Sequence, residues 1–283
     1  MTARFQINQF SSLEDVESET SLVKPIPLDK VGVSYLSGTQ YYSLAGGQTG
    51  FTHVDICSCD YSSNRLKIWR GSVSDWLQKT KMAQRASEVL DNIVSARPNF
   101  AGLDMSATHL MGVVNVTPDS FSDGGQFLQP EAAIRHAKSL IFDGASIIDV
   151  GGESTRPGAI QITTTEENQR VIPVTQTLSK HNILVSVDTR NPEIMRTALL
   201  EGAQIINDIS GFRNKECLRV IADAYKAGIY PYVVIMHMQG EPTIMQEAPS
   251  YNFAPVDIYM YLQEQIDLLV SSGLPRSNIA VDV

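Results

Sequence analysis

Residues 111–125 read MGVVNVTPDSFSDGG. The run begins with apolar residues, reaches the polar amide of Asn115, and continues into hydroxyl groups, two acids and a pair of glycines. Proline and glycine that follow an apolar run in this way mark the end of a buried strand. Because small polar groups suit a ligand better than a packed interior, we predict a strand that delivers Asn115 into a ligand-binding loop.

The same strand signal recurs along the rest of the chain, at intervals of about 30 residues. Pro130 and Gly144 bound one helix between the strands, and Asn191-Pro192 with Gly202 bound another, since these residues commonly start and end helices. Repeated strand–helix units of this kind predict a parallel sheet. The predicted strands lie at residues 113–115, 146–150, 183–188, 204–208, 232–237 and 279–282.

Polar residues at the strand ends favour one kind of parallel sheet. Both a (β/α)₈ barrel and an open doubly wound sheet fit the alternation, and a barrel places its active site at the carboxyl ends of its strands. Residues that can bind a ligand or ionise end nearly every predicted strand, so they would ring a single mouth, and the barrel is preferred. They are Asn115, Asp149, Asp188, Asn207 with Asp208, His237 and Asp282.

Residues 1–105 read differently from the rest. The first 30 are polar and irregular and are expected to be mobile, and short β-like runs follow between residues 31 and 69. Residues 76–96 carry helical spacing of apolar side chains. We find no catalytic pattern in this part. The prediction is a small α+β or irregular extension over residues 1–105, followed by the barrel over residues 106–283.

Composition narrows the class of protein. The 283 residues carry a net charge of -9, which argues against general nucleic-acid binding because that needs a basic surface. The three cysteines cannot form a disulfide framework, and Cys57 and Cys59 lack the second pair that a zinc site needs. No apolar run reaches about 18 residues, and the acidic N-terminus does not read as a signal peptide. We therefore expect a cytoplasmic protein without nucleic-acid or membrane partners.

A second motif, DVGGESTRPG, occupies residues 149–158. Its glycine pair lets the backbone approach a ligand closely, and Arg156 offers a planar donor fork for a carboxylate or a diphosphate. Together the two motifs closely resemble dihydropteroate synthase, the folate-pathway enzyme that joins a pterin to p-aminobenzoate. Some bacterial members of that family carry an N-terminal extension similar in length to residues 1–105.

The resemblance implies roles for individual residues. It makes Asn115 the contact for Mg²⁺ and diphosphate and, with Arg156, a catalytic residue. Alternatively, Asn115 only caps its own loop, Arg156 lies on a solvated turn, and each strand-end acid is structural. His237 is left without a catalytic role. The implied p-aminobenzoate pocket is Thr155, Arg156 and Pro157, and the implied pterin pocket is Asp188, Asn207, Met236 and Asp282.

The reaction implied by the resemblance is an alkyl transfer. The aromatic amine of p-aminobenzoate attacks the methylene of 6-hydroxymethyl-7,8-dihydropterin diphosphate, giving 7,8-dihydropteroate and diphosphate. Such a site works by positioning and by stabilising the charge of the leaving group, with Mg²⁺ as the implied cofactor. The expected partners are these two small molecules, and a homodimer is left open as the oligomeric state.

The last residues depart from the family pattern. Val283 stands where the family continues with proline and glycine, and the family's later lysine, arginine and histidine are absent. We therefore expect a truncated or frameshifted synthase. The main alternative is an inactive remnant that binds pterin or a partner protein without turnover. Another pterin-binding barrel, such as the methyltetrahydrofolate-binding part of a corrinoid methyltransferase, would have no reason to carry both motifs.

Overall fold

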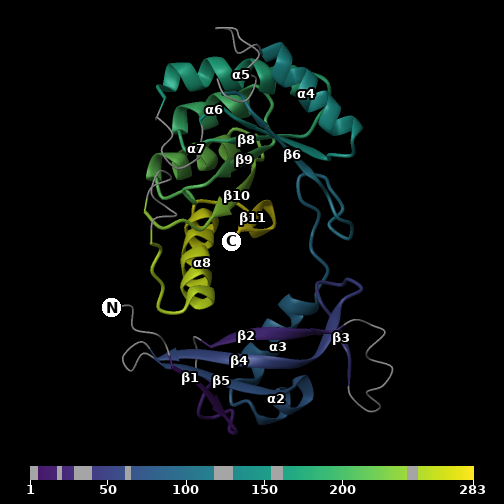
Figure 1. Cartoon of the computed structure of the whole chain (residues 1–283), viewed down its shortest axis with the longest axis vertical. Helices are drawn as coiled ribbons and strands as arrows, with labels where there is room; N and C mark the ends of the chain where they lie inside the picture. Colours follow the sequence, from purple (N-terminus) through teal and green to yellow (C-terminus); the bar gives the residue numbers. More distant parts are fainter. Residues whose placement is uncertain are drawn as a thin grey trace. The chain divides into compact units, whose positions relative to one another are not determined.

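A computed structural model describes the protein at residues 6–17, 21–28, 40–60, 65–117, 130–153, 162–240 and 248–283 (Figure 1). The chain divides into two compact units. The first contains Met1–Pro98 with Ser250–Asp257, and the second contains Asn99–Pro249 with Ile258–Val283. Within the described ranges, no helix is both long enough and apolar enough to cross a membrane.

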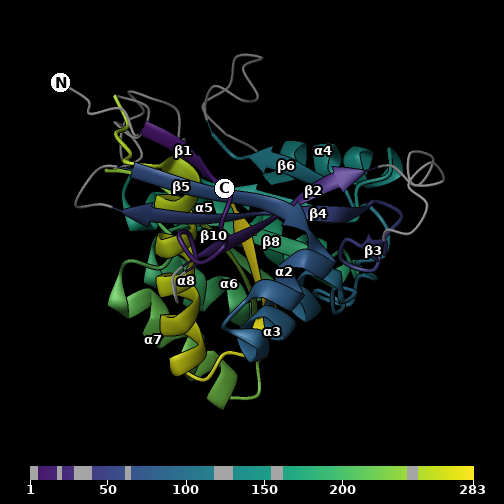
Figure 2. The same ribbon diagram turned by 90° about the horizontal axis from the view of Figure 1, so that it is seen from below.

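The first unit contains a mixed five-stranded sheet (Figure 2). Its order is β1 (Gln6–Phe10), β5 (Arg65–Ser72), β4 (Gly50–Asp60) and β2 (Leu22–Leu28), with β3 (Tyr42–Ser43) also paired to β4. β1 runs parallel to β5, and the other pairs are antiparallel. The expectation of an irregular start is thus wrong for β1 and β2, because both gain their order from pairing with strands much later in the sequence.

Two short helices follow this sheet where one helical segment was predicted. α2 (Val73–Lys79) is capped by the Ser72 side chain, which accepts from the Asp75 N–H, and α3 (Ala83–Val94) follows. The segment breaks because Thr80 is extended, with ψ of 138°, and closes α2 through its N–H. Apolar side chains from both helices still pack into the core of this unit, as helical spacing predicted. They include Trp76, Ala86 and Leu90.

The second unit is built on a six-stranded parallel sheet in which the strands follow one another in sequence order. In the described residues, five α-helices connect successive strands, and the short 3₁₀ helix η2 (Arg276–Asn278) precedes the last strand. Each predicted strand is present, with ends that differ by at most a few residues. The strands are β6 (Met111–Asn115), β7 (Ile147–Gly151), β8 (Val185–Asp188), β9 (Ile205–Asp208), β10 (Tyr232–Met236) and β11 (Ile279–Asp282). The helices are α4 (Pro130–Phe142), α5 (Thr164–Lys180), α6 (Pro192–Leu200), α7 (Lys215–Lys226) and α8 (Ala254–Ser271).

One face of the parallel sheet packs against the helices and the other carries the polar side chains. The helix-side face holds a register row of fully buried residues that includes Val150, Val187 and Ile206. Helices α4 to α7 succeed one another along the strands (Figure 1), and Ala137 and Ile194 join the same core. Parallel strands in sequence order with helices outside form an incomplete (β/α)₈ barrel, as predicted.

Candidate functional site

Three of the predicted site residues lie in one register row across the inner face of the parallel sheet. Asn115 on β6 pairs with Gly151 on β7, Gly151 pairs with Asp188 on β8, and Asp188 pairs with Asn207 on β9. Each of these four residues lies at or next to the carboxyl end of its strand. The fold therefore brings Asn115, Asp188 and Asn207 to one edge of the sheet, which is where (β/α)₈ barrels place their active sites.

Gly151 separates two of these polar side chains. A Cβ atom at this position would lie 3.2 Å from Asn115 Oδ1 and 3.5 Å from Asp188 Oδ2. Both oxygens thus flank the backbone of Gly151 from neighbouring strands. The absence of a side chain leaves room between an amide oxygen and a carboxylate oxygen, which are the types of ligand that Mg²⁺ takes in proteins.

Met236 and Asp282 lie on the two strands at the β11 edge of the sheet. They are register partners at the ends of β10 and β11. On β10, Val234 pairs with Asn207, so Met236 shares the inner face with Asn207 and lies two residues closer to the carboxyl end. Met236 is half-buried and Asp282 is exposed. All four residues predicted to bind the pterin therefore lie on neighbouring strands β8 to β11.

Asp149 was expected at a strand end, and this is wrong. β7 continues to Gly151, so Asp149 lies in the middle of the strand, below the row of Asn115 and Asp188. Its side chain is only 5% exposed, and Oδ2 accepts a hydrogen bond from Nδ2 of Asn207 at 3.1 Å. From the sequence, Asp149 was placed in the ring of strand-end groups but not in the pterin pocket, because the residues IIDVG of β7 show no polar–apolar alternation that would reveal which face it takes.

Burial raises the pKa values of two acids on the inner face. Burial raises the pKa of Asp149, and the side chains of Ser186 and Asn207 partly offset this effect. Burial raises the pKa of Asp188 well above its ordinary value, and the nearby carboxylate of Asp149 raises it further. When they are ionised, these two acids make the inner face rich in hydrogen-bond acceptors.

Asp208 faces the opposite side of β9 and has a structural role. It pairs in register with Ile235 and is fully buried. Its Oδ1 accepts from the backbone and the hydroxyl of Ser210 at 2.8 and 2.7 Å, and its Oδ2 accepts from the N–H of Phe212 at 2.9 Å. The carboxylate therefore holds the turn between β9 and α7, and Asp208 does not belong to the predicted ring of ligand-binding groups.

His237 also has a packing partner. Its ring contacts the ring of Tyr261 edge-on, with the centroids 5.1 Å apart. The Tyr261 hydroxyl donates to the carbonyl of Ser210 at 3.1 Å.

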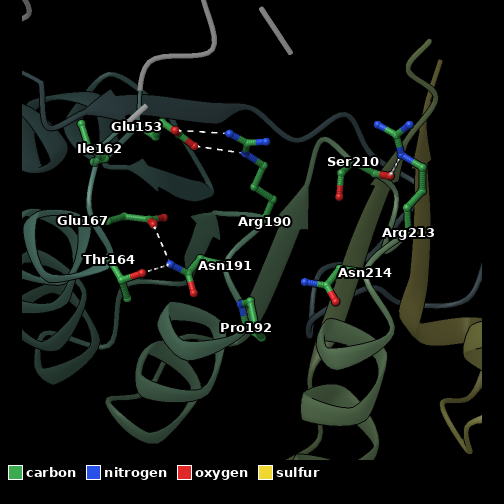
Figure 3. A pocket seen from close by; sticks show the side chains of 10 residues that line it. All are labelled: Glu153, Ile162, Thr164, Glu167, Arg190, Asn191, Pro192, Ser210, Arg213 and Asn214. Atoms are coloured by element: carbon green, nitrogen blue, oxygen red, sulfur yellow. Dashed lines mark hydrogen bonds and ion pairs between the residues drawn. The ribbon is translucent and has the colours of Figure 1, made fainter. Parts of the chain in front are cut away.

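A cavity of about 490 Å³ lies beside the carboxyl ends of β7, β8 and β9 (Figure 3). Arg190 and Glu153 form an ion pair across it, with Nε–Oε2 at 3.2 Å. Asn191 donates to Thr164 at 2.8 Å on a second wall. The residues lining this cavity are Glu153, Ile162, Thr164, Glu167, Arg190, Asn191, Pro192, Ser210, Arg213 and Asn214. Among the described residues that line this cavity, none is a predicted site residue.

The residues predicted for the p-aminobenzoate pocket, Thr155, Arg156 and Pro157, lie outside the described residues. The same holds for most of the loop that follows Asn115. In the ranges that the structure does describe, no group of three or more His, Cys, Asp or Glu residues is arranged to hold a metal ion.

Comparison with protein families gives one match that covers most of the second unit. The model described as "Pterin binding enzyme" matches residues 111–283. Among curated proteins, the dihydropteroate synthase of Escherichia coli strain K12 is 44% identical over 181 residues. That alignment covers 64% of this chain and 62% of the relative, so the chain spans less than two thirds of the length of the protein it resembles.

Solved structures of dihydropteroate synthases are also similar to this chain. The dihydropteroate synthase of Xanthomonas albilineans with 4-aminobenzoic acid is 40% identical, has a TM-score of 0.58, and is matched over 65% of this chain and 64% of that one. The Burkholderia cenocepacia dihydropteroate synthase complexed with 7,8-dihydropteroate is 36% identical with a TM-score of 0.56. The second alignment covers 64% of this chain and 60% of the other.

Proposed function

We propose a function for this chain from the premise that it belongs to the pterin-binding enzyme family. The resemblance to dihydropteroate synthase that the two motifs indicated is confirmed by the identities of 36 to 44% to synthases of that name. The proposed reaction joins 6-hydroxymethyl-7,8-dihydropterin diphosphate to p-aminobenzoate and gives 7,8-dihydropteroate and diphosphate. It is assigned to residues 106–283, and residues 1–105 form an extension to which no step is assigned.

The observation that carries the proposal is the placement of the four proposed pterin contacts on adjacent strands. A pterin presents a guanidine-like edge of N–H donors, so it needs oxygen acceptors in one plane. Asp188 and Asn207 are register partners that supply such acceptors, and Asp282 supplies a carboxylate from β11. Met236, between them on β10, would pack its thioether on the flat ring.

Asn115 is proposed to contact the diphosphate and the metal ion. Its amide oxygen faces the space above Gly151 together with Asp188 Oδ2, and this donor set fits Mg²⁺, which takes few protein ligands and keeps phosphate oxygens as the others. When bound, the ion would offset the negative charge of the diphosphate. Thr155, Arg156 and Pro157 are proposed to form the p-aminobenzoate pocket, with the guanidinium of Arg156 binding an anion.

The chemical step then needs positioning rather than a protein nucleophile. The amine nitrogen of p-aminobenzoate forms a bond to the methylene carbon of the pterin as the carbon–oxygen bond to diphosphate breaks. The amine loses a proton, and diphosphate leaves with the electron pair of the broken bond. Asp188, Asn207 and Met236 would hold the pterin ring so that its methylene faces the incoming amine. A homodimer is retained as part of the proposal.

The test is formation of 7,8-dihydropteroate by the 283-residue chain from the two substrates with MgCl₂. We expect turnover that is lost on chelation with EDTA and in Asn115→Ala, while pterin binding by the Asn115→Ala chain persists. Gln48→Ala, in the first unit, is the control and should leave turnover unchanged. Pterin binding without any turnover by the unaltered chain would contradict the proposed reaction and support a binding function instead.

A further inference from the structure

Asp149 lies on the inner face of the sheet and has no role in the proposed reaction. It lies two residues before Gly151 on β7 and so points to the same side of the sheet, one step deeper. Its carboxylate reaches past β8 to bond Asn207 on β9, with Oδ2 and Nδ2 separated by 3.1 Å. The side chain is 5% exposed, whereas Asn207 is half-buried and reaches the space above it.

This hydrogen bond determines which end of the Asn207 amide faces the site. Of the two ends of an amide, only the NH₂ group donates, and an ionised carboxylate only accepts. With Nδ2 held by Asp149, the carbonyl oxygen Oδ1 of Asn207 is left to face away from that carboxylate. An acceptor at this position matches a ligand edge made of N–H donors. An amide that rotated freely would present the wrong end to that edge in part of the population.

The surroundings of Asp149 also differ from those of a purely structural acid. Asp208, on the other face of β9, has hydrogen bonds to both of its oxygens. In contrast, among the described residues the carboxylate of Asp149 has one hydrogen bond of normal geometry, from Nδ2 of Asn207 to Oδ2, and the buried hydroxyl of Ser186, its register partner, is a further polar neighbour. Buried polar groups of folded proteins are usually hydrogen-bonded. Asn207 is therefore the side chain whose orientation this carboxylate fixes.

We infer that Asp149 is a positioning residue for the substrate's heterocycle: it holds the Asn207 amide so that Oδ1 of Asn207 accepts from the N–H edge of the bound pterin. The inference rests on the proposed function for the identity of the ligand. It does not make Asp149 a catalytic residue, because Asp149 acts through Asn207. The ligand class that this arrangement selects is a fused heterocycle with a guanidine-like donor edge, and ring systems that present an acceptor there are rejected.

Two substitutions separate positioning from a general effect on folding. Asp149→Asn keeps an oxygen that can accept from Asn207, whereas Asp149→Leu fills the same volume without an acceptor. The matched controls are Asp143→Asn and Asp143→Leu, at an exposed position just after α4. Circular dichroism and thermal melting identify any variant that fails to fold, and the asparagine variant keeps the test decisive if the leucine variant does not fold.

Two readouts are compared. We expect the affinity for 6-hydroxymethyl-7,8-dihydropterin to fall about 10- to 100-fold in Asp149→Leu and less than about 3-fold in Asp149→Asn, as loss of one buried hydrogen bond predicts. The KM for p-aminobenzoate should stay unchanged. In ¹⁵N spectra, the Asn207 side-chain NH₂ should exchange slowly with solvent in the unaltered chain and in Asp149→Asn, and rapidly in Asp149→Leu.

The two readouts also separate this inference from the proposed function. Equal pterin affinity in the leucine variant and the unaltered chain would overturn the inference while leaving the function intact. The inference would also be overturned if Asp149→Asn lost as much pterin affinity as the variant Asn207→Ala. If the unaltered chain binds no pterin, the proposed function fails, and the exchange rates of the Asn207 amide alone decide whether Asp149 orients it.

Discussion

The side-chain amide of Asn207 on β9 donates a hydrogen bond of 3.1 Å to the carboxylate of Asp149 on β7, although β8 lies between the two strands. A flat sheet would keep side chains of alternate strands about 10 Å apart, which is twice the spacing of neighbouring strands. In a (β/α)₈ barrel, side chains from alternate strands meet in layers inside the barrel. The bond therefore follows from barrel curvature, and it joins a buried acid of the inner face to the proposed site.

Asp188→Ala tests the proposed pterin contact. We expect the affinity for 6-hydroxymethyl-7,8-dihydropterin to fall about 10- to 100-fold, because the ligand's N–H donors would lose a charged acceptor. Titration calorimetry measures the affinity directly. Asp143→Ala, at an exposed position, serves as the control. Unchanged affinity in Asp188→Ala would remove this residue from the pterin pocket.

Gly151→Ala tests the space between Asn115 and Asp188. The new methyl group would lie 3.2 Å from Asn115 Oδ1, so that side chain must move by a few tenths of an ångström. We expect a loss of folding stability below about 1 kcal/mol, since Asn115 is exposed, and a loss of affinity for the pterin diphosphate of about 10-fold. Gly47→Ala is the matched control, because its methyl group would meet a backbone oxygen at a similar 3.3 Å in the first unit. Equal affinities in the two variants would contradict the placement of the site above Gly151.

Asp208→Ala tests the distinction between the two faces of β9. Removing the carboxylate leaves the N–H of Ser210 and the buried N–H of Phe212 without their acceptor. We expect the free energy of unfolding to fall by roughly 2–4 kcal/mol, measured by urea denaturation. Asp223→Ala, on the exposed side of α7, should change it by no more than about 0.5 kcal/mol. A stability loss no greater than that of Asp223→Ala would show that the turn does not depend on this carboxylate.

The raised pKa of Asp188 predicts how stability depends on pH. Burial, reinforced by the carboxylate of Asp149, raises its pKa well above the ordinary 3.8, so the folded chain keeps this proton at a pH where the unfolded chain has lost it. The folded state is then favoured by this group at pH below 3.8 and loses that advantage as the pH rises through the raised value. Asp188→Asn cannot ionise and should remove this part of the slope.

Urea midpoints measured from pH 4 to pH 8 test this directly, because the slope begins near the ordinary pKa of 3.8. We expect the midpoint of the unaltered chain to decline with rising pH more steeply than that of Asp188→Asn, and the variant to be the more stable of the two at pH 8. Some slope should remain in the variant, because burial raises the pKa of Asp149 in the same direction. Parallel curves for the two chains would mean that Asp188 ionises freely in the folded state.

Much of the parallel sheet could be predicted from local signals. Pro130, Gly144 and Gly202 mark helix limits through backbone preferences that act within a few residues, so the strands between them were placed to within a few positions. Asn115, Asp188 and Asn207 were recognisable because each ends or nearly ends a strand. In parallel strands that run in one direction, such ends meet at one edge without further information.

The remaining features depend on contacts between distant parts of the chain. β1 pairs with β5, with Gln6 opposite Arg65, and the sequence of residues 6–10 does not predict this pairing. Asp149 is hidden in a strand whose five residues are all buried, so the alternation that separates two faces is missing. Its link to Asn207 arises only when the sheet curves, which is a property of the whole unit rather than of either segment.

The most direct test of the account is a crystal structure of the chain with 6-hydroxymethyl-7,8-dihydropterin. We predict that the ring lies on the inner face of β8 to β11, with its N–H edge within hydrogen-bonding distance of the Asp188 carboxylate and of Asn207 Oδ1. The Asn207 Nδ2 atom should remain bonded to Asp149. A ring bound instead in the cavity between Glu153 and Arg213 would contradict the account, as would a chain that binds no pterin.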